Sequence, residues 1–470
     1  MTATTTPVDM ATEPFLSGRF APVHHEISAD HLGVTGTIPT DLTGAYLRNG
    51  PNPEFPPLGS YTYPLEGDGM LHGVWLEAGQ ARYANRYVRT QGMKAEERAG
   101  HAIFGGLMTP AFVDTALLGD DPDPGWPFKL DAFIHIVRHG GHYLALAEGS
   151  PPYEVSPALD TIGRYDATGG MCAHPKIDPV TGEMVIFRYD VEAPFLSWST
   201  IGADGTVTQP PVAVDGVDEG YMIHDFAITA SYVVLVVGPM QFDLDAMMTG
   251  GNPLAWKPEL GTRIAVIPRD RKGPTRWIHH DAFWAWHYAN AFEDGGRIHL
   301  DFPYSSAPAM MLAPDARRDI TYGFTRATLD PAAGTADLQH LDAIGTEFPR
   351  IDDRLTGLAH RYLTVAGRSG SPALQMGEHD VLYRYDMTAG TSTRYDAGAA
   401  IGEVTFAPRT GSTHELDGYY LAFGTGLVDG SSSLYIWDAA EFPAPPVATV
   451  HIPQRIPNGL HGNWFAADGS

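Results

Sequence analysis

The chain has 470 residues, 43% of them hydrophobic and 11% aromatic, so it can bury a large core. Its 56 acidic residues against 30 basic ones give a formal net charge of -26, which argues against nucleic acid as a partner, because phosphate binding needs a basic surface. The single cysteine, Cys172, excludes an intramolecular disulfide. No secretory signal or membrane-length apolar run is visible, so we expect a cytoplasmic protein. Composition identifies no protein partner.

Short Gly- and Asp-rich turns between β-forming runs recur from about residue 40 onward, which is the pattern of β-hairpins. Examples are LEAGQARYANRYV, RHGGHYLALAEG, EDGGRIHLDF and DMTAGTSTRYD. Because no linker interrupts this rhythm, we expect a single all-β domain over residues 1–470, with residues 1–30 as an N-terminal arm. A seven-bladed β-propeller accommodates the length, at about 60 to 65 residues per blade. A sandwich or two smaller β domains are the alternatives.

Two segments break the β rhythm, residues 91–130 and residues 239–260. The first reads as partly helical and then apolar, and the second is rich in methionine and aromatic residues. Insertions of this kind gather on one face of a propeller and often carry function. We expect them to form a cap of helices and loops over a site on the axis, although simple covering of the blade ends explains each of them equally well.

Four histidines lie in apolar or Gly-rich surroundings, with gaps of 50, 63 and 174 residues between them. They are His174, His224, His287 and His461. The first two gaps approximate one blade each, as expected for residues on the inner strands of separate blades. One such histidine is more often a core residue than a ligand, but four on a radial architecture favour a site for iron, zinc, copper or nickel. Glutamates in apolar contexts, which could orient the imidazoles, are Glu148, Glu347 and Glu403.

These pieces together resemble the carotenoid cleavage oxygenase family, over nearly the whole chain. The motifs are GAYLRNGPNPEF, LEGDGMLHGVWLEAGQARYANRYVRT, AHPKIDPVTGEM, MIHDFAIT, WHYANAFED, EFPRID, GEVTFAPR and PQRIPNGLHGNWF. The resemblance implies a capped seven-bladed propeller with one Fe(II) per chain on its axis. It implies that the four histidines are the iron ligands and that the three glutamates orient all of them except His174. The implied reaction is a dioxygenase reaction, cleavage of a C=C bond by O2 to two carbonyl products.

Departures from the family pattern bear on the substrate. Members that cleave stilbenes and phenylpropenoids carry a Lys and a Tyr that bind the phenol, where this chain has Ala147 and Leu107. Neither side chain can hydrogen-bond a phenol, so we expect a carotenoid or apocarotenoid, with a stilbene or phenylpropenoid as the alternative. Ile134 stands where many members have a Thr whose methyl shields one open iron position. Asp225, beside His224, is interpreted as structural.

The apolar residues of the first insertion allow two interpretations. They are Phe104, Leu107, Met108, Phe112, Leu117 and Leu118. They either form the mouth of a substrate pocket that contacts a membrane to collect an apolar substrate, or they pack over the blade ends. Calcium-dependent lactonases and binding scaffolds also use propellers, but calcium needs converging oxygen ligands where this chain offers imidazoles.

Overall fold

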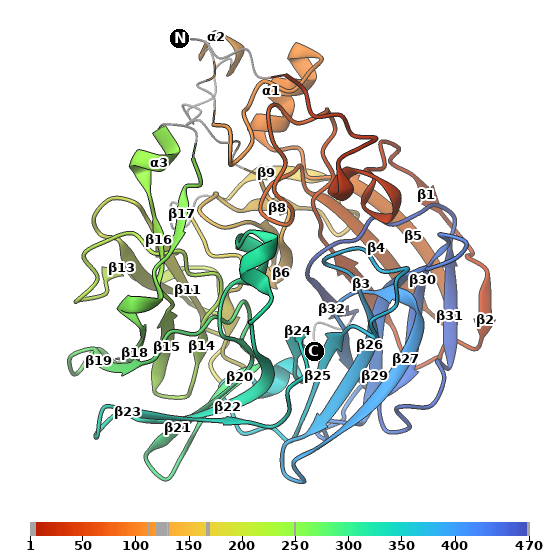
Figure 1. Cartoon of the computed structure of the whole chain (residues 1–470). Coiled ribbons are helices and arrows are strands. Elements are labelled where there is room, and N and C mark those ends of the chain that lie inside the picture. The colour runs from red at the N-terminus through yellow and green to blue at the C-terminus, as the bar shows by residue number, and fades with distance from the viewer. Residues whose placement is uncertain are drawn as a thin grey trace.

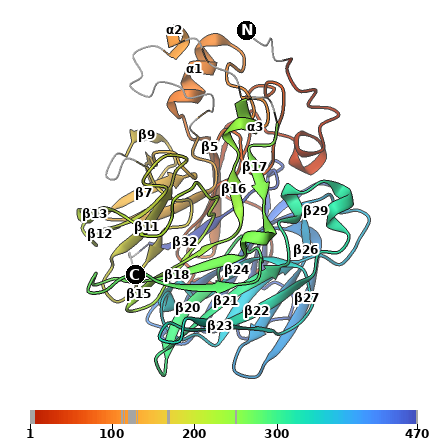
Figure 2. The ribbon, with the colours of Figure 1, turned by 60° about the vertical axis from the view of Figure 1, so that its left-hand side comes forward.

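The computed structural model describes residues 6–110, 113, 115–118, 129, 131–165, 170–248 and 251–467. Its regular structure is mainly β-strand, in antiparallel sheets that surround a common centre (Figure 1). The α-helices of the described part lie toward one end of the molecule (Figure 2). They are α1 (Gln91–Ala99), α2 (Thr115–Leu118) and α3 (Leu244–Met248). None of the helices in this part of the chain combines the length and the hydropathy that a membrane span needs.

Four of the sheets each contain four antiparallel strands. The first contains β6 (His135–His139), β7 (His142–Leu146), β8 (Tyr153–Val155) and β9 (Thr161–Arg164). The second contains β10 (Lys176–Ile177), β11 (Met184–Tyr189), β12 (Leu196–Ile201) and β13 (Val207–Ala213). The third contains β14 (Ala227–Ile228), β15 (Tyr232–Val237), β18 (Thr262–Pro268) and β19 (Arg276–His280). The fourth contains β20 (Asn290–Asp294), β21 (Arg297–Ser305), β22 (Tyr322–Asp330) and β23 (Thr335–His340).

The remaining strands form two larger sheets and one ribbon. The nine-stranded sheet contains β24 (Thr346–Arg350), β25 (Tyr362–Gly367), β26 (His379–Asp386), β27 (Thr391–Ile401), β28 (Thr405–Pro408), β29 (Gly418–Gly426), β30 (Ser432–Asp438), β31 (Ala448–Ile452) and β2 (Val34–Gly36). The five-stranded sheet contains β32 (Gly462–Ala466), β3 (Gly44–Arg48), β4 (Met70–Glu77), β5 (Gln80–Tyr87) and β1 (Ser28–Ala29). The ribbon pairs β16 (Met240–Phe242) with β17 (Leu254–Trp256). Short 3-10 helices span Pro14–Leu16, Gly18–Phe20, Pro258–Leu260, Ala309–Met311, Pro314–Arg317 and Asp353–Leu355.

The Gly-rich turns predicted from the sequence do connect hairpins. In the β6–β7 hairpin, His139 pairs with His142 across the turn Gly140–Gly141. Both glycines have positive φ, 56° and 85°, as a two-residue turn between twisted strands requires. The hairpin prediction is confirmed there, and the β4–β5 and β20–β21 pairs follow the same pattern.

Hydrophobic clusters join each sheet to its neighbours. One cluster unites β6 and β7 with β11, β12 and β15, and others join the third sheet to the fourth and the fourth to the nine-stranded sheet. The five-stranded sheet packs on β29 to β31 on one side and on β6 and β7 on the other, so the packing runs round the whole centre. Its own strands β3 and β32 pair in the register Gly44↔Ala466, joining two segments that lie far apart in the chain.

The expected N-terminal arm and insertions have definite places among the described residues. Phe15 and Phe20 of the arm pack on the ring of Tyr63, with ring centroids 5.1 and 4.9 Å away. The segment 91–130 contains α1 and α2, and the segment 239–260 contains β16, α3 and β17. Residues 111–112, 114, 119–128, 130 and 249–250 of the two insertions lie outside the described part, and Phe112 is among them.

Candidate metal centre

The four predicted histidines come from four different sheets. Each lies shortly before an edge strand of its sheet, His174 before β10, His224 before β14, His287 before β20 and His461 directly before β32. The expectation that the histidines lie on inner strands was wrong in detail, because each lies just before its strand: β14 begins only at Ala227 and β20 only at Asn290. The extended segments before these strands are held by individual hydrogen bonds, such as Met222 N–H to Met240 O at 2.9 Å.

The imidazoles of these histidines meet at one point. The Nε2 atoms of His174 and His224, of His224 and His287, and of His287 and His461 are each 3.1 Å apart. One nitrogen from every ring lies within 4.8 Å of those from the other three. His174, His224 and His461 are buried and His287 is half-buried, so the nitrogens converge away from bulk water.

Three of the rings are held from behind by the predicted glutamates. Glu347 Oε2 lies 2.7 Å from Nδ1 of His287, and Glu403 Oε1 lies 2.9 Å from Nδ1 of His461. Glu148 Oε1 contacts Nδ1 of His224 in the same way. Among the described residues no carboxylate hydrogen-bonds His174, which is the ring for which the sequence predicted none.

This pattern of contacts fits a bound cation. An ionised carboxylate only accepts hydrogen bonds, so the rings of His224, His287 and His461 carry their proton on Nδ1 and leave Nε2 with a lone pair. At 3.1 Å, the Nε2 pairs of His224 with His287 and of His287 with His461 then have no proton between them. Converging imidazole lone pairs are the donor set of Fe, Zn, Cu or Ni, and the carboxylates behind them are typical second partners of ligating histidines.

Burial favours the neutral form of His174 and His461. Desolvation and the neighbouring imidazoles hold the pKa of His174 well below its usual value. Burial also lowers the pKa of His461 to about 4, against the opposing effect of Glu403. For His224, burial acts in the same direction, but the contact with Glu148 outweighs it and raises the pKa. The pKa of Glu403 is lowered, because Arg350 and His461 outweigh its burial.

Asp225 binds groups of the surrounding scaffold and none of the four imidazoles among the described contacts. Its Oδ1 accepts the Phe226 N–H at 2.7 Å and pairs with Lys176 Nζ at 2.7 Å. Its Oδ2 accepts the Tyr288 N–H at 2.9 Å. The carboxylate therefore ties together the segments that carry His224 and His287, which agrees with its structural interpretation.

A cavity of about 700 Å³ lies next to Glu148. The four residues predicted from the sequence to line the substrate pocket, Phe104, Leu107, Ile134 and Ala147, all line this cavity. Ile134 lies near the histidines as well, because its carbonyl accepts the His461 N–H at 3.1 Å. Phe104 and Leu118 are buried in a small cluster with Ala95, whereas the Leu117 side chain is 42% exposed.

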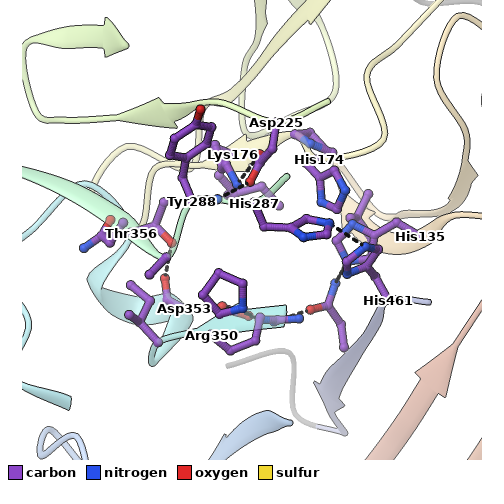
Figure 3. Close-up of a pocket in the computed structure, with 18 of the residues that line it drawn as sticks. His135, His174, Lys176, Asp225, His287, Tyr288, Arg350, Asp353, Thr356 and His461 are labelled. Carbon is purple, nitrogen blue, oxygen red and sulfur yellow. Dashed lines mark hydrogen bonds and ion pairs between the residues drawn. The ribbon is translucent and has the colours of Figure 1, made fainter. Parts of the chain in front are cut away.

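A second cavity, of about 350 Å³, reaches three of the four histidines along a different set of residues (Figure 3). Its lining includes the charged residues Lys176, Asp225, Arg350 and Asp353. The smaller cavity therefore borders the histidine cluster directly, whereas the larger cavity reaches Glu148 and Ile134, which contact His224 and His461.

Three residues around the cluster were not found from the sequence. Tyr189 donates its hydroxyl to Glu148 Oε2 at 2.5 Å, and Arg350 donates to Glu403 Oε2 at 2.9 Å. His135 lies with its ring centroid 5.5 Å from that of His174 and 5.4 Å from that of His461. The only sequence signal for His135 was its place in the apolar run FIHIV, which many core strands share.

The chain is similar to known proteins both in sequence and in fold. Residues 20–466 match the family model described as retinal pigment epithelial membrane protein. A carotenoid cleavage oxygenase of Mycobacterium tuberculosis is 31% identical, over 98% of this chain and 99% of the relative. The lignostilbene dioxygenase of Pseudomonas brassicacearum has a TM-score of 0.87 at 26% identity, covering 97% of this chain and 99% of that one. Cobalt-substituted Synechocystis apocarotenoid oxygenase has a TM-score of 0.79 at 27% identity, covering 94% and 96%. This chain therefore belongs to the retinal pigment epithelial membrane protein family, the family of the carotenoid cleavage oxygenases.

Proposed function

We propose that the protein is a non-haem Fe(II) dioxygenase that cleaves a C=C bond with O2. The convergence of the four Nε2 atoms carries this proposal, with His174, His224, His287 and His461 as ligands of one iron ion per chain. Glu148, Glu347 and Glu403 orient three of these ligands. Ferrous iron held by four neutral imidazoles would supply electrons and open coordination positions for O2.

The proposed reaction balances without another redox partner. The C=C bond and the O–O bond break, and two C=O bonds form, so alkene and O2 together become two carbonyl products. The chain's own residues then have to position the alkene and keep bulk water out. Ile134 would shield the reacting position, a role supported by its backbone bond to His461 and its place in the lining of the larger cavity.

The larger cavity favours an apolar alkene with an oxygen function at one end. Its lining contains Ile134, Ala147 and Phe104, but also Lys129 with its carboxylate partners. A few polar groups in a mainly apolar pocket fix the orientation of a ligand. An apocarotenoid joins a long apolar polyene to such an oxygen function. We therefore place carotenoids and apocarotenoids first, with a stilbene or phenylpropenoid as the alternative, because solved and curated relatives are named for both classes.

We also propose a seven-bladed propeller formed by one domain over residues 1–470. The support is the count of sheets, since the nine-stranded sheet divides at the β27–β29 junction into two units of four or more strands. These two, the four separate sheets and the five-stranded sheet make seven. Segments 91–130 and 239–260 form the proposed cap, since parts of both line the larger cavity.

Two further expectations concern the surroundings of the protein. A cytoplasmic location stays a prediction from composition. Peripheral contact with a membrane through the insertion 91–130 stays a prediction as well, and exposed Leu117 is the residue through which it would act. Sedimentation with phosphatidylcholine vesicles, comparing the native chain with Leu117→Glu, tests this contact.

The decisive experiment follows the reaction from anaerobic to aerobic conditions. The ferrous-loaded protein is incubated with β-carotene, an apocarotenal and a hydroxystilbene, and the products are separated by mass. We expect one iron per chain and two carbonyl products from the apocarotenal, and loss of both iron and activity in His287→Ala. The matched control is His299→Ala on β21, a half-buried histidine outside the cluster. A wild-type protein without stoichiometric iron would contradict the oxygenase proposal, and cleavage of the stilbene alone would reverse the order of substrates.

A further inference from the structure

His174 differs from the other three histidines in its support. No carboxylate among the described residues holds its ring, although ligating histidines usually pass their second N–H to a carboxylate or a carbonyl. A fifth histidine, His135, lies beside it, at 5.5 Å between ring centroids and an interplanar angle of 40° (Figure 3). The hydrogen bonds of His135 show what it contributes.

The protonation of His135 follows from a chain of contacts that begins at Arg350. A guanidinium only donates, so the Asn463 atom 2.7 Å from Arg350 Nη2 is the amide oxygen. The Asn463 amide nitrogen then faces the other way, donating to His135 Nε2 at 3.1 Å and to the Ile136 carbonyl at 2.8 Å. His135 Nε2 is therefore an acceptor, and its proton lies on Nδ1, which donates to the Ala173 carbonyl at 3.1 Å.

The last of these contacts acts on His174 directly. The Ala173 carbonyl belongs to the peptide unit that joins Ala173 to His174, so fixing that carbonyl fixes the plane from which the His174 side chain leaves the backbone. Ala173, His135 and His174 are all buried, and a buried carbonyl held by a directed donor has little freedom to rotate.

We propose that His135, oriented by Asn463 and Arg350, is a positioning residue that replaces the missing glutamate behind His174. The inference rests on the proposed function, since it concerns the geometry of the metal ligands. Arg350 gives it a second consequence. Its Nη1 donates to Glu403 Oε2 at 2.9 Å, and Glu403 holds His461, so one guanidinium supports two of the four ligands.

The alternative explanation is that His135 is an ordinary core histidine whose hydrogen bonds serve only to satisfy its own buried ring. That explanation predicts a loss of stability on substitution, but no specific effect on the metal centre. Cobalt(II) separates the two explanations, because its absorption spectrum reports the number and arrangement of imidazole ligands without any turnover.

The test is a Co2+ titration of the full chain, followed by absorbance. In His135→Phe, which keeps a ring but loses both hydrogen bonds, we expect a dissociation constant about 10–100-fold higher and an altered spectrum. His135→Asn, whose amide can still donate to the Ala173 carbonyl, should restore part of the affinity. The matched control is His72→Phe, which removes a buried histidine bonded to the Tyr83 hydroxyl at 2.8 Å on β4 and should leave the spectrum unchanged.

A double-mutant cycle tests the connection to Asn463. If the two residues act in one chain of contacts, His135→Phe combined with Asn463→Leu weakens Co2+ binding by less than the product of the separate effects. Co2+ binding by folded His135→Phe equal to that of the wild type overturns this inference and leaves the proposed function intact. A wild-type protein that binds no Co2+ overturns the proposed function, and the inference with it.

Discussion

At the scale of single residues, Ala147 and Leu107 leave two positions of the larger cavity's lining without a polar side chain. Both line the larger cavity, Ala147 next to Glu148 and Leu107 with its backbone N–H bonded to Glu66 Oε2 at 2.9 Å. Neither side chain offers a donor or an acceptor. The cavity therefore has no phenol-binding group at these two positions.

Restoring such groups should change the substrate preference. In the double variant Ala147→Lys with Leu107→Tyr, we expect the rate on a hydroxystilbene relative to an apocarotenal to rise about tenfold or more, because a hydrogen bond to a charged group contributes about 1.5–3 kcal/mol. Competition assays with both substrates measure the ratio. Ala147→Met, which adds volume without charge, is the control, and an equal shift in that variant would show that size and not polarity sets the preference.

The sequence identified the converging histidines but not the residues that hold His174. His174, His224, His287 and His461 share a distinctive context of apolar or small neighbours at blade-like intervals. His135 lies within β6, and its role depends on contacts with Ala173 and Asn463, which are distant in sequence. Contacts of that kind leave no local pattern, so a single sequence cannot reveal them.

At the scale of secondary-structure elements, helix α1 is fastened to the wall of the larger cavity by Lys129. Its ammonium pairs with Glu96 Oε2 of α1 at 2.7 Å and with Asp68, which precedes β4, and the lysine side chain is only 13% exposed. Glu96 also accepts the Ile103 N–H at 2.9 Å. This buried ion pair joins the insertion to the strands beneath it.

Removing the ammonium should loosen the insertion. In Lys129→Met, Glu96 and Asp68 lose their partner, and breaking one side of a buried pair typically costs about 3–5 kcal/mol. We expect faster hydrogen exchange of the amides in 91–99 and a lower unfolding temperature. The control on the same helix is Glu97→Gln, which breaks the half-exposed pair with Arg89 at 2.9 Å and should cost at most about 1 kcal/mol. Unchanged exchange in Lys129→Met would refute the fastening role.

The sequence predicts insertions at residues 91–130 and 239–260, because these segments interrupt a regular rhythm of hairpins. It did not predict where the strands next to the histidines begin. His224 and His287 lie in apolar stretches that alternate as a strand does, but Asp225 binds the N–H groups of Phe226 and Tyr288 there and takes the place of a neighbouring strand. A side chain that substitutes for strand pairing cannot be distinguished from an ordinary strand residue by pattern alone.

At the scale of the whole molecule, the candidate ligands join four sheets at one point. Metal binding should therefore stabilise the complete ring and not any single sheet. Co2+ at 100 times its dissociation constant should add about 2.7 kcal/mol to the free energy of unfolding. Thermal unfolding with and without the ion measures this, and His287→Ala should show no gain. If Co2+ does not change the unfolding temperature of the wild-type protein, the result would contradict a site shared between the sheets.

The overall architecture was accessible from the sequence only in outline. Hairpin turns such as Gly140–Gly141 indicated antiparallel sheets, and their even spacing indicated repeated units. The continuation of β27 into a pair with β29 was not foreseeable, because residues 399–401 pair with β29 after the irregularity at Gly398 within the strand, where φ is 65°. Which sheets merge depends on the packing between units, and no local signal encodes it.

The pairing of β3 with β32 also has a consequence for biosynthesis. His461 directly precedes β32, so the fourth imidazole reaches the centre only when that strand adds to β3. His174 and His461 are 287 residues apart, and ribosomes add about 5–20 residues per second. His461 is therefore synthesised on the order of 15–60 s after His174. During that interval a nascent chain offers at most three of its imidazoles to a metal ion. The complete four-histidine cluster therefore cannot form until translation has passed residue 461.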